Sequence, residues 1–241
     1  MEPDIIYEDK YLIAIHKPAG VATQTSRVTS PDIVSITSGY LSGSGKSSVA
    51  NDSVPFIGLI NRLDQPVEGI VLMARDKRSA SLLSEQLRNN EIEKHYLAGI
   101  VGSKPEQGHL TGNILFDKRT NTSSMVPDNT PGSKPAALEY HMIKTIKPQN
   151  CSPSEDTVIS LADIHLITGR HHQIRVQMSD AGLPLLGDRK YAPEYVRNVN
   201  DLLKISEICL CACSLTFTHP VNNDKISLRV KPQCRWYRLF N

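Results

Sequence analysis

The chain has 241 residues, of which 39% are hydrophobic and 22% are charged, and its formal net charge is +2. These proportions describe an ordinary globular protein that is long enough to bury a substantial core. No apolar run approaches the ~20 residues that a membrane-spanning helix needs, so the sequence argues against a membrane protein. The near-neutral charge neither supports nor excludes binding to nucleic acid.

Five cysteines, an odd number, occur in a chain that is too large to depend on disulfide bonds, which fits a reducing compartment. The N-terminus is acidic and leads directly into a strand-like pattern, so we expect no signal peptide. Together these features predict a cytoplasmic protein.

The first part of the chain predicts a β-hairpin followed by a helix. Residues 5–7 and 11–15 read as two strands around a polar turn, and the K-P-A-G segment at 17–20 ends the second strand. A proline at position 31 is typical of the first position of a helix. Residues 42–54 are rich in serine and glycine and are expected to form a flexible surface loop.

Two buried strands are expected next, at residues 55–60 and 69–74, with a loop at 61–68 between them. Asp76 is expected to cap a helix that extends to about Asn89. The loop therefore lies between two strand ends.

Most of the remaining elements are predicted to be strands. A helix over 170–181 would stop at Gly182, and residues 147–156 are a polar loop. Because many strands follow one another without a helix between them, we expect an α+β fold with a mixed, mainly antiparallel sheet flanked by helices. The further strands are expected at 95–101, 108–116, 137–146, 158–167, 209–217 and 225–230.

Asp64 is the most informative residue of the loop at 61–68. It stands at a strand end, and Pro66 and Gly69 restrict the backbone around it. A carboxylate on a rigid support is typical of an active site. A capping or turn aspartate is the plainer interpretation when the segment is considered alone.

Short motifs occur in a fixed order along the chain and change that interpretation. They are K-P-A-G at 17–20, R-L-D at 62–64 with Gly69, K-H-Y-L-A at 94–98, T-G-R-H-H-Q-I-R at 168–175, G-L-P at 182–184 with Gly187, Asp188 and Tyr191, and finally Leu210, Ala212, Leu215, Phe217, His219 and Pro220. One such motif is weak evidence, whereas five or more in the correct order are strong. Taken together they resemble the motifs of the RluA-type RNA pseudouridine synthases.

The resemblance implies a specific reaction. The C1′–N1 bond of a uridine breaks, the base turns, and it rejoins the ribose through C5, without exchange of atoms or electrons with another molecule. No cofactor and no metal are therefore implied. Asp64 would attack the ribose or abstract a ribose proton, and both routes stay open.

The resemblance also assigns roles to other residues. Tyr96 would place its ring against the uracil and its hydroxyl near C5, and Arg175 would hold Asp64 ionised and oriented. Arg62 is expected to contact RNA beside the flipped nucleotide. Arg170 and Lys17 are further candidates for contacts with RNA phosphates.

The implied partner is a structured RNA, ribosomal or transfer, whose target uridine is flipped out of its stack. The implied fold has a central RNA-binding cleft within a single catalytic domain spanning residues 1–241. No S4-type RNA-binding domain is expected before it, and we expect a monomer.

Several positions depart from the family pattern. Asn61 replaces a histidine, Val67 and Glu68 replace a Thr-Ser pair, and Gln177 and Cys211 replace histidines. These changes keep open a catalytically weakened, RNA-binding member of the same fold.

A retaining glycosidase is a second alternative to the pseudouridine synthase. It would need a second carboxylate ~5–5.5 Å from the first. Only Glu68 and Asp76 are near Asp64 in the sequence, and neither stands in a supporting motif.

Three other features have plainer interpretations. The G-S-G-K-S segment at 43–47 lacks the spacing of a phosphate-binding loop. His171 and His172 are expected to be neighbours on a helix and so to point to different faces, which disfavours a shared metal. Asp188 is expected to cap or brace the loop around Gly187.

Overall fold

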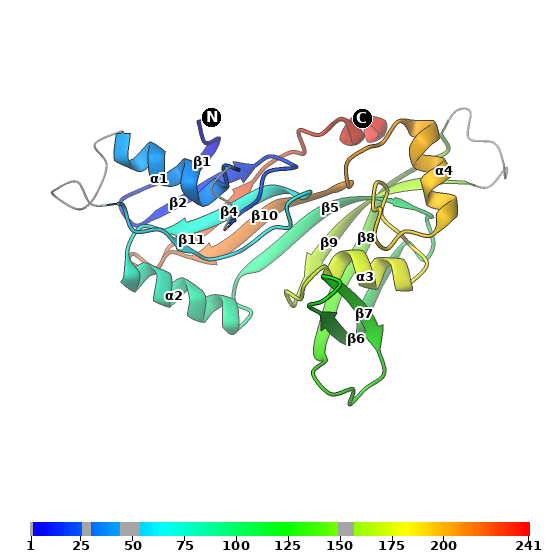
Figure 1. Ribbon diagram of the computed structural model, residues 1–241, viewed down its shortest axis with the longest axis horizontal. Helices are drawn as coiled ribbons and strands as arrows, with labels where there is room; N and C mark the ends of the chain where they lie inside the picture. Colours follow the sequence, from blue (N-terminus) through cyan, green and yellow to red (C-terminus); the bar gives the residue numbers. More distant parts are fainter. Residues whose placement is uncertain (1, 26–29, 44–53, 149–156) are drawn as a thin grey trace. The chain divides into compact units, whose positions relative to one another are not determined.

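The protein is described by a computed structural model that covers residues 2–25, 30–43, 54–148 and 157–241 (Figure 1). Its contacts divide the chain into two compact units. Unit 1 consists of Met1–Glu93 and Ala212–Pro232, and unit 2 consists of Lys94–Cys211 and Gln233–Asn241. The single domain expected over residues 1–241 therefore stays a prediction. No helix in the described ranges has the length and apolar character of a membrane span.

Unit 1 is built on a β-sheet (Figure 1). The order of hydrogen-bonded strands is β1-β2-β4-β10, with β11 paired to β10 and β3 paired to β4. The β1–β2, β2–β4, β3–β4 and β10–β11 pairs are antiparallel. Its elements are β1 (Ile5–Glu8), β2 (Leu12–Lys17), α1 (Ile33–Gly43), β3 (Gly58–Leu59), β4 (Glu68–Ala74), α2 (Lys77–Arg88), β11 (Lys225–Arg229) and all but the first two residues of β10 (Leu210–Thr218).

The core of unit 1 lies around its two central strands. Every residue of β2 and of β4 is buried, which explains why both sequences are almost continuously apolar. On one face of the sheet, Leu12, Leu72 and Phe217 belong to the same hydrophobic cluster as Leu83 of α2. Burial of side chains of this size stabilises the fold by about 1.5–3 kcal/mol each.

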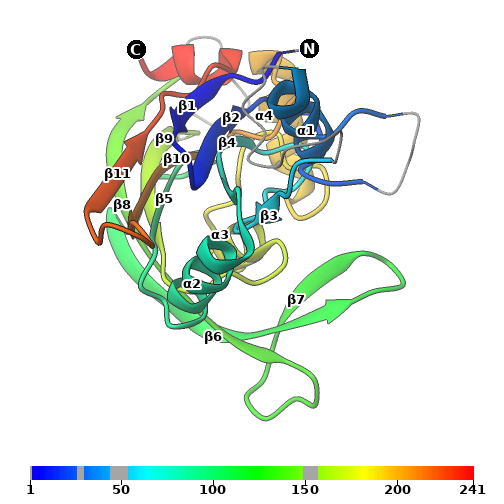
Figure 2. The same ribbon diagram turned by 90° about the vertical axis from the view of Figure 1, so that its left-hand side faces the viewer.

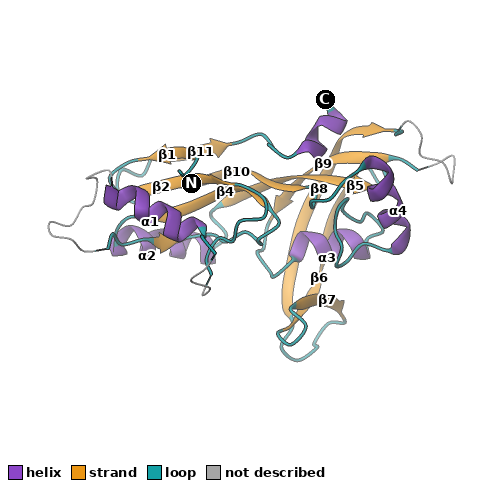
Figure 3. Cartoon of the chain, turned by 45° about the horizontal axis from the view of Figure 1, so that its top comes forward, coloured by secondary structure: helices purple, strands orange, loops and turns teal. Residues whose placement is uncertain are grey.

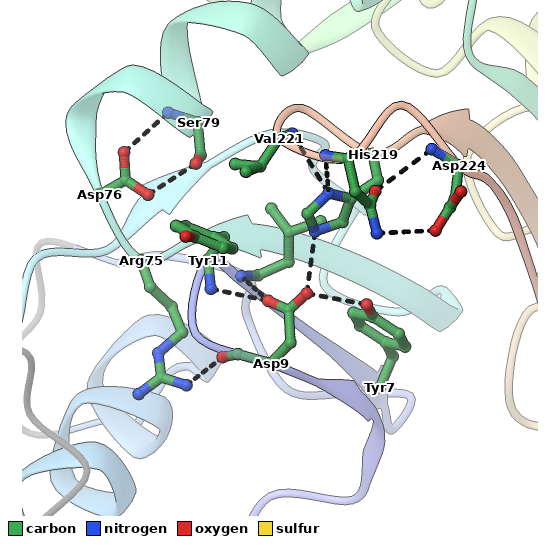
Figure 4. Close-up of polar contacts among 11 residues, drawn as sticks. Tyr7, Asp9, Tyr11, Arg75, Asp76, Ser79, His219, Val221 and Asp224 are labelled. Carbon is green, nitrogen blue, oxygen red and sulfur yellow. Dashed lines mark hydrogen bonds and ion pairs between the residues drawn. The ribbon is translucent and has the colours of Figure 1, made fainter.

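A carboxylate, Asp9, joins the N-terminal hairpin to the turn between β10 and β11 (Figure 4). Its Oδ1 accepts hydrogen bonds from the backbone N–H groups of Tyr11 and Leu12, both at 2.7 Å. Its Oδ2 contacts the Tyr7 hydroxyl at 2.8 Å and His219 Nε2 at 2.9 Å. Burial alone would raise the pKa of Asp9, but these hydrogen bonds outweigh it and lower the pKa. The histidine of the last sequence motif thus has a structural role in unit 1.

Unit 2 contains a second run of antiparallel strands, in the order β5-β9-β8-β6-β7. The β6–β7 hairpin extends away from β5 and β9 (Figure 2), and α3 and α4 lie on the same side of these strands (Figure 3). The elements are β5 (Glu93–Val101), whose first residue belongs to unit 1, β6 (Gln107–Asp117), β7 (Thr122–Val126), β8 (Lys134–Ile146), β9 (Ile159–Leu166), α3 (Gln173–Asp180), α4 (Glu194–Leu203) and the 3₁₀ helix η1 (Arg235–Phe240).

The predicted α+β class with a mixed, mainly antiparallel sheet is confirmed, and the strands expected from residue 95 onward are present with shifted bounds. The structure adds β7, α4 and η1, which the sequence analysis did not predict. The central cleft stays a prediction.

The strand expected at 55–60 is wrong except at Gly58–Leu59. Pro55 has no N–H to give to a ladder. Beyond β3, the side-chain amide of Asn61 forms hydrogen bonds with β4 that the backbone of a paired strand would otherwise form. It donates to the Ile70 carbonyl at 2.9 Å and accepts from the Leu72 N–H at 2.8 Å.

The helix expected over 170–181 begins later, at Gln173. His172 has a φ of 54°, a left-handed conformation that cannot continue into the helix. The end before Gly182, with a φ of 74°, is as expected.

The two expected loops lie only partly within the described residues. Ser42 and Gly43 belong to the end of α1, so the loop expected from residue 42 begins too early. Residues 44–53, and 149–156 of the second loop, lie outside the described residues.

Gly69→Ala is expected to destabilise unit 1. Gly69 has a φ of +128°, and a Cβ there would lie 2.4 Å from the backbone oxygen of Ala212. Since this obstacle is backbone, we expect a loss of about 1–3 kcal/mol or more in the free energy of unfolding, measured with urea. The control Gly39→Ala, in α1 with nothing within 4 Å, should raise stability by about 0.5–1 kcal/mol. Equal effects of the two changes would contradict this account.

Candidate active site

The loop between β3 and β4 presents Asp64 on a fixed backbone. Asp64 is half-buried, whereas its neighbour Leu63 is buried. The Thr23 hydroxyl donates to the Leu63 carbonyl at 2.8 Å and accepts from the Leu63 N–H at 3.1 Å. One buried side chain thus satisfies both backbone groups of the residue before Asp64. A turn bond from Val67 N–H to the Asp64 carbonyl, 3.0 Å long, closes the loop.

The residue after Asp64 is held by the K-P-A-G segment. The Gln65 carbonyl accepts hydrogen bonds from Gly20 N–H at 2.9 Å and from Lys17 Nζ at 3.0 Å. In return, the Gln65 side-chain amide donates to the Gly20 carbonyl at 2.9 Å. Gly20 has a φ of +85°, which a residue with a side chain rarely adopts. Both neighbours of Asp64 are therefore fixed by residues from earlier in the chain.

The expected contact between Lys17 and an RNA phosphate stays a prediction, and the position of the side chain argues against it. Lys17 is 0% exposed. Its Nζ donates to the carbonyls of Pro18 at 3.1 Å, Val21 at 2.6 Å and Gln65 at 3.0 Å. A phosphate could reach this ammonium only by displacing those carbonyls. Lys17 instead cross-links segment 17–20 to the Asp64 loop.

Two departures from the family pattern have structural roles. Asn61 pairs with β4 through its side-chain amide, as described above. Glu68 is 2% exposed, and its carboxylate lies 3.7 Å from His16 Nε2.

Neither carboxylate considered for a glycosidase is placed for that role. Glu68 is buried and faces His16. Asp76 caps α2, accepting from the Ser79 N–H at 2.9 Å and from its hydroxyl at 2.6 Å. Burial opposes ionisation of Asp76, but the hydrogen bonds with Ser79 lower its pKa overall. The sequence basis for a retaining glycosidase is thereby lost.

Tyr96 lies in β5 of unit 2 and is 9% exposed. It stands opposite Ile164 of β9, which stands opposite Tyr140 of β8. These three residues form one cross-strand row on the buried face of the sheet. A ring held in such a row is a firm support for a flat base.

Arg175 lies in α3, and Asp188 fixes its guanidinium. Arg175 Nε and Nη2 donate to the two carboxylate oxygens of Asp188, each at 2.8 Å. The guanidinium carbon also lies 5.0 Å from the centre of the Tyr191 ring. Burial alone would raise the pKa of Asp188, but the hydrogen bonds and charge of Arg175 outweigh it and lower the pKa. The result is a buried, bidentate ion pair.

Asp188 therefore does more than the bracing expected from the sequence. It does brace its loop, since its Oδ1 accepts from the N–H groups of Lys190 at 2.8 Å and Tyr191 at 3.2 Å. Its role as the anchor of Arg175 was not predicted. The sequence signal for this role was the presence of Asp188 in the motif that follows the motif containing Arg175.

The expectation that His171 and His172 point to different faces of a helix is wrong. Both precede α3, and their ring centroids lie 3.7 Å apart. His171 Nδ1 contacts the Ser123 hydroxyl at 2.9 Å, and His172 Nδ1 contacts the Tyr191 hydroxyl at 2.6 Å. Burial, followed by the charge of Arg175, lowers the pKa of His172 to about 3, so this ring is neutral at physiological pH. The pair joins α3 to β7 and to Tyr191.

The two other candidate RNA contacts are accessible. Arg62 is exposed in the Asp64 loop of unit 1. Arg170 is half-buried in unit 2, where its Nε donates to the Pro135 carbonyl at 2.8 Å. The expected pairing of Arg175 with Asp64 joins residues of different units and stays a prediction.

Comparisons with known proteins agree with the motifs. The family model for RNA pseudouridylate synthase matches residues 11–180. A tRNA pseudouridine synthase C of Haemophilus ducreyi is 30% identical over 246 residues, which are 100% of this chain and 96% of that protein. A ribosomal large subunit pseudouridine synthase C of Buchnera aphidicola subsp. Schizaphis graminum is 28% identical over 93% of this chain and 66% of its own length.

Solved structures support the fold. The human RNA pseudouridylate synthase domain containing 4 superposes with a TM-score of 0.74 at 22% identity, covering 97% of this chain and 90% of its own. The human domain containing 1 superposes with a TM-score of 0.72 at 17% identity. The family match over residues 11–180 confirms the resemblance drawn from the motifs: the chain belongs to the RNA pseudouridylate synthase family and is an RNA pseudouridine synthase.

Proposed function

We propose that this enzyme converts uridine to pseudouridine at a specific site in a transfer or ribosomal RNA, with Asp64 as its catalytic carboxylate. The observation that carries the proposal is the double fixation of the Asp64 loop. Thr23 holds the residue before Asp64, and Lys17 and Gly20 hold the residue after it. A half-buried carboxylate on such a support is preorganised to meet a ribose.

The chemistry needs little besides this group. An aspartate requires no partner to lose its proton at neutral pH, so it is ready to attack a ribose or to remove a ribose proton. Tyr96 supplies a supported ring for the uracil and a hydroxyl for proton movement at C5. All atoms of the product come from the substrate, so no cofactor is needed.

Arg175 is the residue that we propose for orienting Asp64. Its guanidinium is already fixed by Asp188, which takes the Nε and one Nη2 hydrogen bond. A guanidinium has five N–H donors, so a fork fixed on one side can serve a second carboxylate from the other. Asp188 thereby acts through Arg175 as a positioning residue.

The substrate follows from the chemistry of the base. A stacked uridine cannot turn, so it must leave the helix, which costs a few kcal/mol unless it lies in a loop or bulge. The exposed Arg62, two residues before Asp64, is suited to contact RNA beside the extruded nucleotide. We therefore propose a uridine in a structured loop as the target, acted on in the cytoplasm by a monomer.

Asp64→Asn should abolish pseudouridine formation while RNA binding persists, because the amide keeps the shape of the side chain but is not a nucleophile or a base. Pseudouridine is measured in transfer and ribosomal RNA after incubation with each protein. Asp201→Asn, an exposed change in α4, serves as the matched control and should retain activity. Turnover by the Asp64 variant near that of the wild type would remove Asp64 from the mechanism. A wild-type protein that binds RNA without any turnover would favour the catalytically weakened alternative.

Arg62→Gln should weaken RNA binding and flatten its salt dependence, by about 0.7 in slope for each lost single-strand phosphate contact. The measurement is the dissociation constant for unmodified RNA transcripts across a series of salt concentrations. Arg197→Gln, which removes an exposed charge from α4, is the control. An unchanged slope for the Arg62 variant would place this residue outside the interface.

Lys17→Met should lower stability and activity together without changing the salt slope. The methionine cannot donate to the three carbonyls that Lys17 serves, so buried acceptors lose their partner. We expect a loss of roughly 2 kcal/mol or more in the free energy of unfolding. Urea unfolding and the RNA titrations just described test this expectation. A flatter slope with unchanged stability would return Lys17 to the RNA interface.

A further inference from the structure

A second buried lysine, Lys94, differs from Lys17 in having no partner among the described residues. It lies at the start of the buried face of β5 and is 7% exposed. Among the residues that the structure describes, none accepts a hydrogen bond from its ammonium or forms an ion pair with it. The side chain is largely buried, but its ammonium keeps some contact with solvent, so the free protein presents a positive charge without a counterion among the described residues, at a point that a ligand can reach.

A second positive charge, that of Arg170, disfavours the charged form of Lys94 further. Burial, followed by the positive charge of Arg170, lowers the pKa of Lys94. Arg170 Nε donates to the Pro135 carbonyl at 2.8 Å, and within the described ranges no carboxylate pairs with Arg170. Unit 2 can neutralise a buried cation, as the bidentate pairing of Arg175 with Asp188 shows. The two cations at Lys94 and Arg170 are instead left together without an anion.

The position of Lys94 relative to Tyr96 indicates what the anion is. The two residues are separated by one position on β5, so their side chains emerge from the same face about 6.6 Å apart along the strand. A nucleotide whose base lies against Tyr96 carries its sugar and phosphate next to that base. Lys94 thus lies one short step along β5 from the ring that is proposed to support the uracil.

We propose that Lys94 and Arg170 form a binding site for an RNA backbone phosphate adjacent to the target uridine. The inference rests on the proposed function for the identity of the nucleotide, but the anion site itself does not depend on turnover. The phosphate supplies the counterion that the free protein lacks. It thereby couples correct placement of the backbone to relief of a buried charge, and Lys94 acts as a positioning residue.

Lys94→Met tests the site because it removes the charge and keeps a long, apolar side chain. If Lys94 binds a phosphate, the variant should unfold at a urea concentration no lower than that of the wild type. Its affinity for unmodified tRNA transcripts should fall about tenfold or more, and the salt slope should fall by about 0.7. In turnover assays the loss should appear more in KM than in kcat. Lower stability with unchanged affinity and slope would show that Lys94 is structural and would overturn the proposal.

Lys225→Met is the matched control for the loss of one positive charge. Lys225 is 71% exposed and pairs with Glu93. Affinity and slope should stay at the wild-type values in this variant. An equal change in both variants would mean that only net charge matters, which would also overturn the site.

Titration of the Lys94 ammonium by NMR, with labelled lysine, separates RNA from free phosphate. Bound anion should raise the lowered pKa of Lys94, because it stabilises the charged form. A rise with tRNA transcripts, and none or less with the same concentration of inorganic phosphate, supports a site built for the RNA backbone. A rise with inorganic phosphate alone, or no rise with either probe, overturns it.

Failure of this inference is distinguishable from failure of the proposed function. A wild type that forms pseudouridine, combined with a Lys94 variant that binds RNA normally, removes the phosphate site alone. A wild type that forms no pseudouridine removes the function, while a weakened Lys94 variant would still establish the anion site.

Discussion

The fixation of one short loop by segment 17–20 is the constraint on which the rest of unit 1 depends. The Lys17 ammonium donates hydrogen bonds to the Gln65 carbonyl and to two carbonyls close to it in the chain. Gly20 donates its N–H to the Gln65 carbonyl and accepts from the Gln65 side-chain amide. Loops are normally the most mobile parts of a protein. Here the loop that carries Asp64 loses that freedom, because its movement would take one of three acceptors from the buried Lys17 ammonium and break both hydrogen bonds with Gly20.

The two buried lysines show how the same side chain serves two purposes. Lys17 is satisfied by three backbone carbonyls, so its charge stabilises the free protein and is not available to a ligand. Lys94 is nearly as buried but has no acceptor in the part of the chain that the structure describes, and the positive charge of Arg170 disfavours its charge further. The first arrangement is typical of a structural cross-link, and the second is typical of a site that is completed by an anion. Burial alone would not distinguish them.

Local patterns in the sequence predicted most of the fold and indicated a candidate site, but not how the loop of that site is held. The Asp76 cap and most strands of unit 1 followed from capping and apolar patterns, which depend on nearby residues. The start of α3 was wrong because His172 adopts a left-handed conformation that sequence periodicity does not reveal. The hydrogen bonds of Lys17 were not predicted, because a motif does not show whether a lysine is buried. Its acceptor on Gln65 lies 48 residues away in the chain.

The Arg175–Asp188 pair carries the same reasoning into unit 2. A lone arginine side chain on a helix could adopt several rotamers. A carboxylate that binds its guanidinium would then have to offset the loss of this conformational freedom, which weakens the binding. Asp188 removes this freedom, and its own pKa is lowered by Arg175 and by the N–H groups of its loop, so the pair stays ionised when pH falls below neutrality. An arginine fixed in this way keeps its direction before substrate arrives. Any carboxylate that Arg175 orients is then held in a fixed direction before substrate binds. A reaction at a single ribose carbon requires such preorganisation.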